Sequence, residues 1–199
     1  MANTLEVWFR AYKELFKLYN IKASYQEIGT KAYGDPYGCV HFGINDVDRF
    51  NARLFALVED KYVNAPLYPN VIKTLKLLRQ ETNHKVCIFT STKRNLIIQA
   101  LKQKKMDQYF DFVIGREDVN KLKPDPQGIE IILNKYFFQK NQTIIIGDTD
   151  KDIIAGAKGG IDTVLFVPKH NLKYYNPKDI IKLTPTHTIN SISEIIHLM

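Results

Sequence analysis

The sequence is poor in cysteine and has no long apolar run. Of its 199 residues only Cys39 and Cys87 are cysteines, and they lie far apart without the ligand spacing of a metal site. We therefore expect two buried thiols in a reducing compartment and no disulfide. No apolar run approaches the roughly 20 residues that a membrane-spanning helix needs, and no charged and then apolar leader opens the chain. The sequence thus predicts a cytoplasmic protein that is neither secreted nor inserted in a membrane.

Negative charge is also scarce. Lys and Arg number 28 against 21 Asp and Glu, which gives a formal net charge of +7. Such an excess can indicate nucleic-acid binding, and the densest cluster is Lys102, Lys104 and Lys105. The lysines are spread along the whole chain, however, and no nucleic-acid motif accompanies them, so a solvated helix face explains the cluster better. We expect no nucleic-acid partner, and the same positive field would favour an anionic phosphate substrate.

The chain divides into a helical part and an α/β part. From Leu5 to Tyr19 apolar residues recur every three or four positions, which predicts an amphipathic helix, and helical pieces continue to Ala65. After a further helix that begins beyond Pro69, strands alternate with helices. The expected strands are KVCIFT, FDFVIG, TIIIGD and TVLFV, and the helices include LIIQALKQ, GIEIILNKYF and SISEIIHLM. This pattern predicts an all-helical lobe at residues 1–65 and an α/β core with a doubly wound parallel sheet at residues 66–199.

Three carboxylates crowd the stretch TIIIGDTDKDIIAGAKGG, residues 143–160. Its isoleucine run is what a parallel strand buried on both faces needs, so Asp148 stands at the carboxyl tip of a strand. A helical pattern begins at Asp152, which puts Asp148 and Asp152 about one turn apart on one side while Asp150 points elsewhere. Ligands bind beyond the strand tips of open α/β sheets, and two carboxylates there suit Mg²⁺. The alternative is that Asp148 is a helix N-cap and its neighbours complement the helix dipole.

Two further polar groups stand just beyond predicted strands. Thr90, Ser91 and Thr92 follow the strand that ends at Phe89, where hydroxyls and amides at a helix start could hold a phosphate oxygen, or could simply form a turn or cap. Lys123 lies in the loop KLKPDP, where a fixed ammonium could neutralise phosphoryl charge, although a lysine alone in a loop would simply be solvated. Hydroxyl, lysine and paired aspartates follow one another at spacings of 33 and 25 residues. Such an ordered series arises by chance far more rarely than any single member.

With Thr90, Lys123, Asp148 and Asp152 in this order, the chain resembles hydrolases of the haloacid dehalogenase superfamily, of the phosphoglycolate phosphatase and β-phosphoglucomutase kind. The resemblance covers nearly the whole chain and implies a Rossmann-like core with a helical cap domain. It also implies Mg²⁺-dependent hydrolysis of a small phosphorylated metabolite, in which an aspartate nucleophile forms an aspartyl-phosphate that water then cleaves.

The same resemblance assigns roles to the matching residues. Thr90, with Ser91, would bind phosphoryl oxygens, and Lys123 would bind phosphate and offset charge on the nucleophile, so Thr90 and Lys123 are the catalytic residues that we expect. Asp148 would bind Mg²⁺, and Asp152 would complete the metal site or orient a metal-bound water or the lysine. The cap sets the substrate and cap sequences follow no simple code, so the metabolite and the oligomeric state stay open.

The nucleophile motif of the family, a strand ending in D-x-D-x-T-L, is not found in the sequence. Family members commonly run on from this motif into the first cap helix, and the opening MANTLEVW resembles the residues just after the missing aspartates. Asp46 and Asp48 have D-x-D spacing but stand in the wrong register and lack the following threonine, so we expect them to begin a cap helix. In the resembling fold the missing strand is central, so its two neighbours must close up or another segment must fill its place.

Three hypotheses of function follow. The first is a phosphatase framework that starts downstream of its nucleophile, so that this chain alone is inactive and binds Mg²⁺ weakly. The second is an inactive relative that binds a phosphorylated ligand or a protein partner. The third, a nucleic-acid binder, rests only on the charge. An in-frame D-x-D-x-T-L upstream would favour the first.

Overall fold

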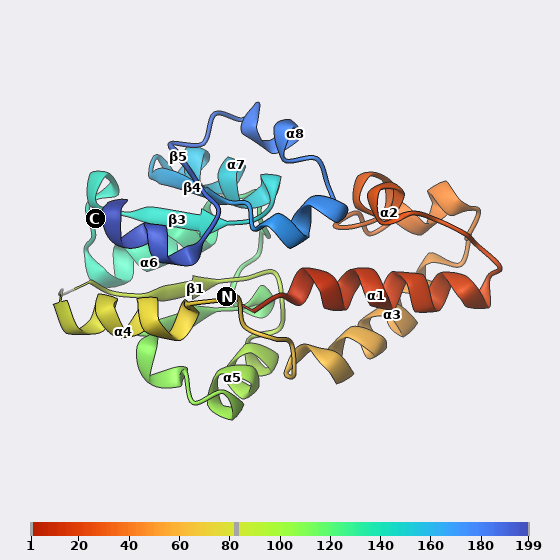
Figure 1. Cartoon of the computed structure of the whole chain (residues 1–199), viewed down its shortest axis with the longest axis horizontal. Helices are drawn as coiled ribbons and strands as arrows, with labels where there is room; N and C mark the ends of the chain where they lie inside the picture. The colour runs from red at the N-terminus through yellow and green to blue at the C-terminus, as the bar shows by residue number, and fades with distance from the viewer. Residues whose placement is uncertain (1, 82–83, 199) are drawn as a thin grey trace. The chain divides into compact units, whose positions relative to one another are not determined.

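The computed structural model describes residues 2–81 and 84–198 and divides the chain into two compact units (Figure 1). The first, the helical unit, runs to Tyr68 and also takes in the later segment His170–Asn176. The second, the α/β unit, comprises Pro69–Lys169 and the chain from Pro177 onward, and it holds every strand that the structure describes. The sequence pattern predicts a division after residue 65, with the later segment in the α/β core.

Polar caps begin the helices of the helical unit. Its elements are α1 (Thr4–Leu18), α2 (Tyr25–Lys31), η1 (Gly38–Phe42), α3 (Val47–Tyr62) and η5 (Lys169–Lys173). The side chains of Asn3, Ser24 and Asp46 accept hydrogen bonds from amides in the first turns of α1, α2 and α3. Such bonds satisfy donors that a helix start leaves unpaired. The prediction that Asp46 and Asp48 begin a cap helix is therefore confirmed, since Asp46 is the N-cap of α3 and Asp48 lies in its first turn.

The later segment is built into the core of the helical unit. Tyr174 is only 1% exposed, and its ring centroid lies 4.4 Å from that of Phe9 on α1. The carbonyl oxygen of Tyr174 lies 2.2 Å from the point where a Cβ at Gly29 would stand, so only glycine allows this approach. The Asn171 amide is fully buried and exchanges hydrogen bonds with the Tyr68 hydroxyl at 3.1 and 3.2 Å. These contacts make the segment an integral part of the unit.

The α/β unit alternates strands and helices. Its elements are α4 (Val71–Glu81), β1 (Cys87–Phe89), α5 (Arg94–Gln103), η2 (Asp107–Tyr109), β2 (Phe112–Ile114), η3 (Arg116–Asp118), α6 (Gln127–Tyr136), η4 (Lys140–Gln142), β3 (Ile144–Gly147), α7 (Asp150–Gly159), β4 (Asp162–Phe166), α8 (Pro177–Ile181), β5 (His187–Ile189) and η6 (Ile192–Leu198). The alternation expected from the apolar pattern is confirmed. The last expected helix is a 3₁₀ helix, and its final residue, Met199, lies outside the described residues. β5 was not predicted because its residues, His187, Thr188 and Ile189, lack the apolar run that marked the other strands.

The strands form parallel sheets in two separate parts. β1 pairs with β2, and β3, β4 and β5 pair in that order. Within the part of the chain that the structure describes, neither β1 nor β3 pairs with a further strand. Each of β1 and β3 therefore has one edge, here called its inner edge, that forms no ladder with another described strand. The two strands also do not pair with each other.

The isoleucine strand β3 corrects one prediction. We expected it to be buried on both faces, but all four of its residues are only half-buried, as are those of β1. The last four residues of β4 are buried instead. The reason is that β4 lies between two strands, whereas β1 and β3 each have a single partner among the described strands.

One apolar layer supports both sheets. Buried residues of α6 and α7 and of the turn after α7 form a cluster of Ile129, Leu133, Ala155 and Ile161. Phe89 of β1 and Ile145 of β3 both pack against this cluster. The same apolar cluster therefore packs against both sheets, although no described strand of one sheet pairs with a strand of the other.

Both cysteines are free thiols, as predicted. Cys39 is buried as expected, but the prediction of burial is wrong for Cys87, which is half-buried because it lies on β1, whose one partner among the described strands is β2. Burial raises the pKa of the Cys87 thiol to about 11. Across residues 2–81 and 84–198, every helix is too short or too polar to cross a bilayer.

Candidate functional site

The predicted site residues lie near the carboxyl ends of β1 and β3, the two strands whose inner edges pair with no other described strand. Thr90 comes directly after β1 and Asp148 directly after β3, while Lys123 lies in the loop before α6. Lys123 joins the two sheets at this edge. Its Nζ donates to the carbonyl oxygen of Phe89, at the end of β1, at 3.1 Å. The same Nζ pairs with Oδ1 of Asp152, in the first turn of α7, at 2.6 Å.

The pair of Lys123 and Asp152 is well shielded, with side chains 13% and 8% exposed. A short charge-assisted hydrogen bond satisfies both charges in this setting. The loop that carries Lys123 is held by Gln127, whose Oε1 accepts from the amides of Asn120 and Lys121, both at 2.9 Å. Gln127 was not predicted from the sequence, although a polar side chain in the first turn of a helix after a loop is a recurrent loop anchor.

Asp152 also organises the start of α7. Its Oδ2 accepts from the amide of Thr149 at 3.2 Å and from the Thr149 hydroxyl at 2.6 Å. Thr149 is the N-cap of α7, so the alternative that Asp148 caps this helix is wrong. Because both oxygens of Asp152 are engaged, this geometry favours its role in holding the lysine over a role as metal ligand. Asp150 is exposed and takes no part in these contacts.

Gly147 is needed where Asp152 approaches the end of β3. A Cβ at position 147 would lie 2.1 Å from the Cβ and 2.2 Å from the carboxyl carbon of Asp152. Such distances are far below van der Waals contact. Any larger residue would displace the carboxylate that holds Lys123, which the sequence pattern alone did not reveal.

Asp148 is half-buried beside this pair. Burial, together with the negative charge of Asp152, raises the pKa of the Asp148 carboxyl to about 6, although Lys123 partly offsets this. A carboxyl with a raised pKa binds its proton more tightly in the folded than in the unfolded chain. Its ionisation therefore costs stability as the pH rises from its ordinary pKa through 6.

The variant Asp148→Asn is expected to melt a few degrees higher than the parent chain at pH 7.5 in the presence of EDTA, because the amide cannot ionise. Near pH 4 the difference should vanish. The control is Asp150→Asn, which changes an exposed carboxylate of the same segment and should leave the melting temperature unchanged at both pH values. Equal effects of Asp148→Asn at the two pH values would contradict the assignment.

The hydroxyl of Thr90 lies in a tight turn. Its Oγ1 accepts from the amide of Thr92 at 3.2 Å. This bond forms the simple turn that the sequence left open as the alternative to a phosphate-binding role. The amide of Thr90 donates to Ile114 at 3.0 Å and extends the β1–β2 ladder by one bond. Ser91 is exposed. The turn does not use the Thr90 hydroxyl proton, so this hydroxyl can still donate to an oxyanion.

The start of α5 is already occupied by a carboxylate. The amide of Arg94 donates to both carboxylate oxygens of Glu117 at 3.0 and 3.1 Å. The hydrogen bond from its own backbone amide, together with that from Arg94 and the nearby positive charges, lowers the pKa of Glu117. The Arg94 amide at the start of α5 is therefore not free to bind a phosphate. Glu117 was missed because it comes from a different loop.

Comparison with known proteins supplies independent findings. The family model of haloacid dehalogenase-like hydrolases matches residues 1–166. Pyrophosphatase PpaX of Halalkalibacterium halodurans is 32% identical over 98 residues, or 49% of this chain and 45% of that protein. Phosphoglycolate phosphatase of Pseudomonas fluorescens is 24% identical over 156 residues, or 77% of this chain and 56% of that protein. The chain thus spans about half the length of these curated relatives.

The fold is also that of solved structures. A haloacid dehalogenase-like family hydrolase from Streptococcus pneumoniae superposes with a TM-score of 0.81 at 16% identity, over 100% of this chain and 92% of that one. At this identity the likeness concerns the fold, and it agrees with the α/β core and helical lobe that the sequence predicted.

Proposed function

Since residues 1–166 match its family model, this chain belongs to the haloacid dehalogenase-like hydrolase family, and we propose that it forms the phosphate- and Mg²⁺-binding part of a phosphatase for a small phosphorylated metabolite. The names of its relatives, a pyrophosphatase and a phosphoglycolate phosphatase, support phosphatase activity. The observation that carries the proposal is the bridge from Lys123 to Phe89 and Asp152, which joins the carboxyl ends of β1 and β3 beside Asp148.

In this proposal the chain's own residues hold the phosphoryl group. The hydroxyls of Thr90 and Ser91 donate to phosphoryl oxygens. The Lys123 ammonium has three donors, of which Phe89 and Asp152 take two, so the third is left for a phosphoryl or carboxylate oxygen. Asp152 keeps the ammonium in place, and the low exposure of the pair strengthens its field on the substrate.

The carboxylates at this edge, Asp148 and Asp152, supply part of the set of oxygen ligands that Mg²⁺ needs. Burial and the charge of Asp152 raise the pKa of Asp148, which marks an excess of negative charge that a divalent cation would relieve. Asp148 would hold the ion, with Asp152 nearby, and the ion would supply positive charge to the phosphoryl oxygens. Among the described residues no group of three or more His, Cys, Asp or Glu is arranged to hold a metal. We therefore expect weak binding of Mg²⁺ by this chain in the absence of phosphate.

The nucleophile is the part that these 199 residues do not supply, because they contain no D-x-D-x-T-L motif. We propose that it is carried by a strand seated between β1 and β3, whose inner edges have no partner among the described strands. A carboxylate at the end of such a strand would attack the phosphorus atom and expel the alcohol, and water would then cleave the aspartyl-phosphate. Without that strand the chain should show negligible hydrolysis, and it would act only as a binder of phosphorylated ligands.

Binding of inorganic phosphate tests the proposed site without requiring turnover. Calorimetry should show that Mg²⁺ strengthens phosphate binding, and that Asp148→Asn removes this effect. Thr90→Val should weaken phosphate binding by about tenfold, because a hydrogen bond to a charged group is lost. Thr30→Val, on an exposed face of α2, serves as the control. A phosphate affinity that changes neither on addition of Mg²⁺ nor in Thr90→Val would refute the proposed site.

A further inference from the structure

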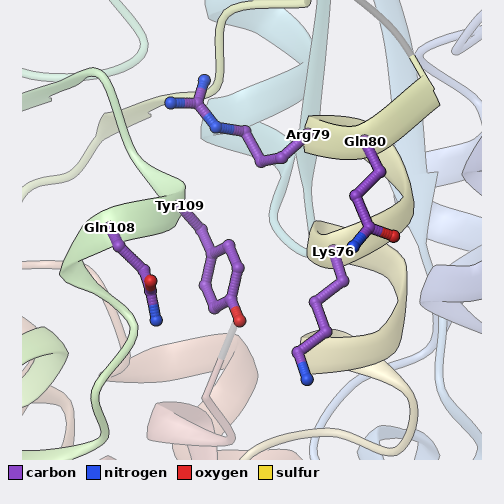
Figure 2. A pocket seen from close by; sticks show the side chains of 5 residues that line it. All are labelled: Lys76, Arg79, Gln80, Gln108 and Tyr109. Carbon is purple, nitrogen blue, oxygen red and sulfur yellow. The ribbon is translucent and has the colours of Figure 1, made fainter.

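A second polar site lies between α4 and η2. A surface pocket of about 330 Å³ is lined by Lys76, Arg79 and Gln80 from α4 and by Gln108 and Tyr109 from η2 (Figure 2). This volume falls in the range of small-ligand sites. None of the five lining side chains is a carboxylate.

The pocket lies at the opposite end of the β1–β2 sheet from Thr90. α4 leads into the amino end of β1, and η2 leads into the amino end of β2. At these amino ends the amide of Val86 donates to Oδ2 of Asp111 at 2.9 Å. Thr90 follows the carboxyl end of β1, so the pocket and the proposed phosphatase site do not share residues.

The lining is rich in donors and positive charge. Lys76 offers an ammonium group, Arg79 a guanidinium and Tyr109 a hydroxyl. Figure 2 shows the Lys76 amine and the Tyr109 hydroxyl at the same end of the pocket, with the Tyr109 ring facing α4. The Lys76 amine has no ion-pair partner among the described residues. An oxyanion could accept hydrogen bonds from both groups at once.

Arg79 is held in a fixed orientation. Its Nη1 pairs with Oδ2 of Asp111 at 2.8 Å, and Asp111 also binds the Lys85 ammonium at 3.1 Å. Asp111 thus shares its single charge between two cations and the Val86 amide. The positive charge at the pocket is therefore not cancelled, and the remaining N–H groups of Arg79 stay available.

We propose that this pocket binds a small oxyanion, with phosphate as the preferred form, at a site separate from the one beside Lys123. The anion would accept from Lys76 and Tyr109 and so link α4 to η2, while the Arg79 guanidinium, which lies at the other end of the pocket in Figure 2, adds positive charge to the site. Because α4 and η2 precede the two strands of the β1–β2 sheet, the bound anion would stabilise this half of the α/β unit.

Titration of the ¹⁵N-labelled chain with inorganic phosphate in EDTA tests the proposal, with the amides of Gln80, Gln108 and Tyr109 as reporters. These amides should shift saturably. Lys76→Met should weaken the binding that they report by about tenfold, because an ammonium contact to the anion is lost. The matched control is Lys73→Met, which removes an exposed lysine one turn earlier on α4 and should change nothing.

Two further arms separate this pocket from the phosphatase site and fix the ligand class. Thr90→Val should leave the titration of the reporter amides unchanged, whatever it does to binding beside Lys123. Acetate should bind more weakly than phosphate. Reporter amides that do not saturate, or an equal loss in Lys73→Met and Lys76→Met, would overturn the proposal. Equal affinity for acetate would overturn the preference for phosphate.

Discussion

A strand ending in D-x-D-x-T-L, fused directly before Ala2, is expected to raise the melting temperature of this chain and to give it Mg²⁺-dependent phosphatase activity. β1 and β3 are half-buried, and neither has a partner at its inner edge among the described strands. A strand between them would form ladders on both sides. At about 1 kcal/mol for each net hydrogen bond, the gain is several kcal/mol, or on the order of 10 °C. The nucleophile should raise the rate over the uncatalysed reaction by on the order of 10⁶-fold or more.

The control is the same fusion with asparagine in place of its first aspartate. It should show the same rise in melting temperature without turnover, because the ladder does not depend on the nucleophile. Thermal unfolding and a broad panel of phosphomonoesters supply the two measurements. If the fusion gains stability and cleaves nothing, the inactive, ligand-binding relative becomes the better hypothesis. If it gains neither, the space between the sheets does not accept a strand.

Replacement of Lys123 by methionine should destabilise the α/β unit by about 3–5 kcal/mol, the usual cost of removing one partner of a buried ion pair. Asp152 is 8% exposed and would lose its cation, and the carbonyl of Phe89 would lose its donor. Urea unfolding of Lys123→Met, Asp152→Asn and the double variant measures the coupling. We expect the double variant to lose clearly less than the sum of the single variants.

The control for this cycle is an exposed pair. Lys182 and Asp179 lie 3.2 Å apart with side chains 75% and 64% exposed. Lys182→Met should change stability by no more than about 0.5 kcal/mol. Additive losses in the Lys123 cycle would mean that the bridge between the two sheets does not contribute as a unit.

Local patterns were sufficient for most of the elements. The spacing of three and four from Leu5 onward produced α1, and Asp46 marked the start of α3. The isoleucine run and the helical pattern after Asp152 located β3 and α7. Such features depend on residues within a few positions of one another, so the sequence reports them directly. The alternative that Asp148 caps α7 was wrong, because Asp148 and Thr149 are both good caps and only the backbone geometry separates them.

The sequence by itself therefore determined the order of strands and helices and the chain positions of Thr90, Lys123 and Asp148 beyond their strands. Only the tertiary structure decided which groups meet. Lys123 pairs with Asp152 across 29 positions, and Glu117 caps α5 across 23 positions. It also decided that Tyr174 belongs to the helical unit and that β3 stays half-buried. The physical reason is that periodicity and capping act within a few residues, whereas ion pairing, close approach at glycine and strand burial depend on neighbours that only the folded chain brings together.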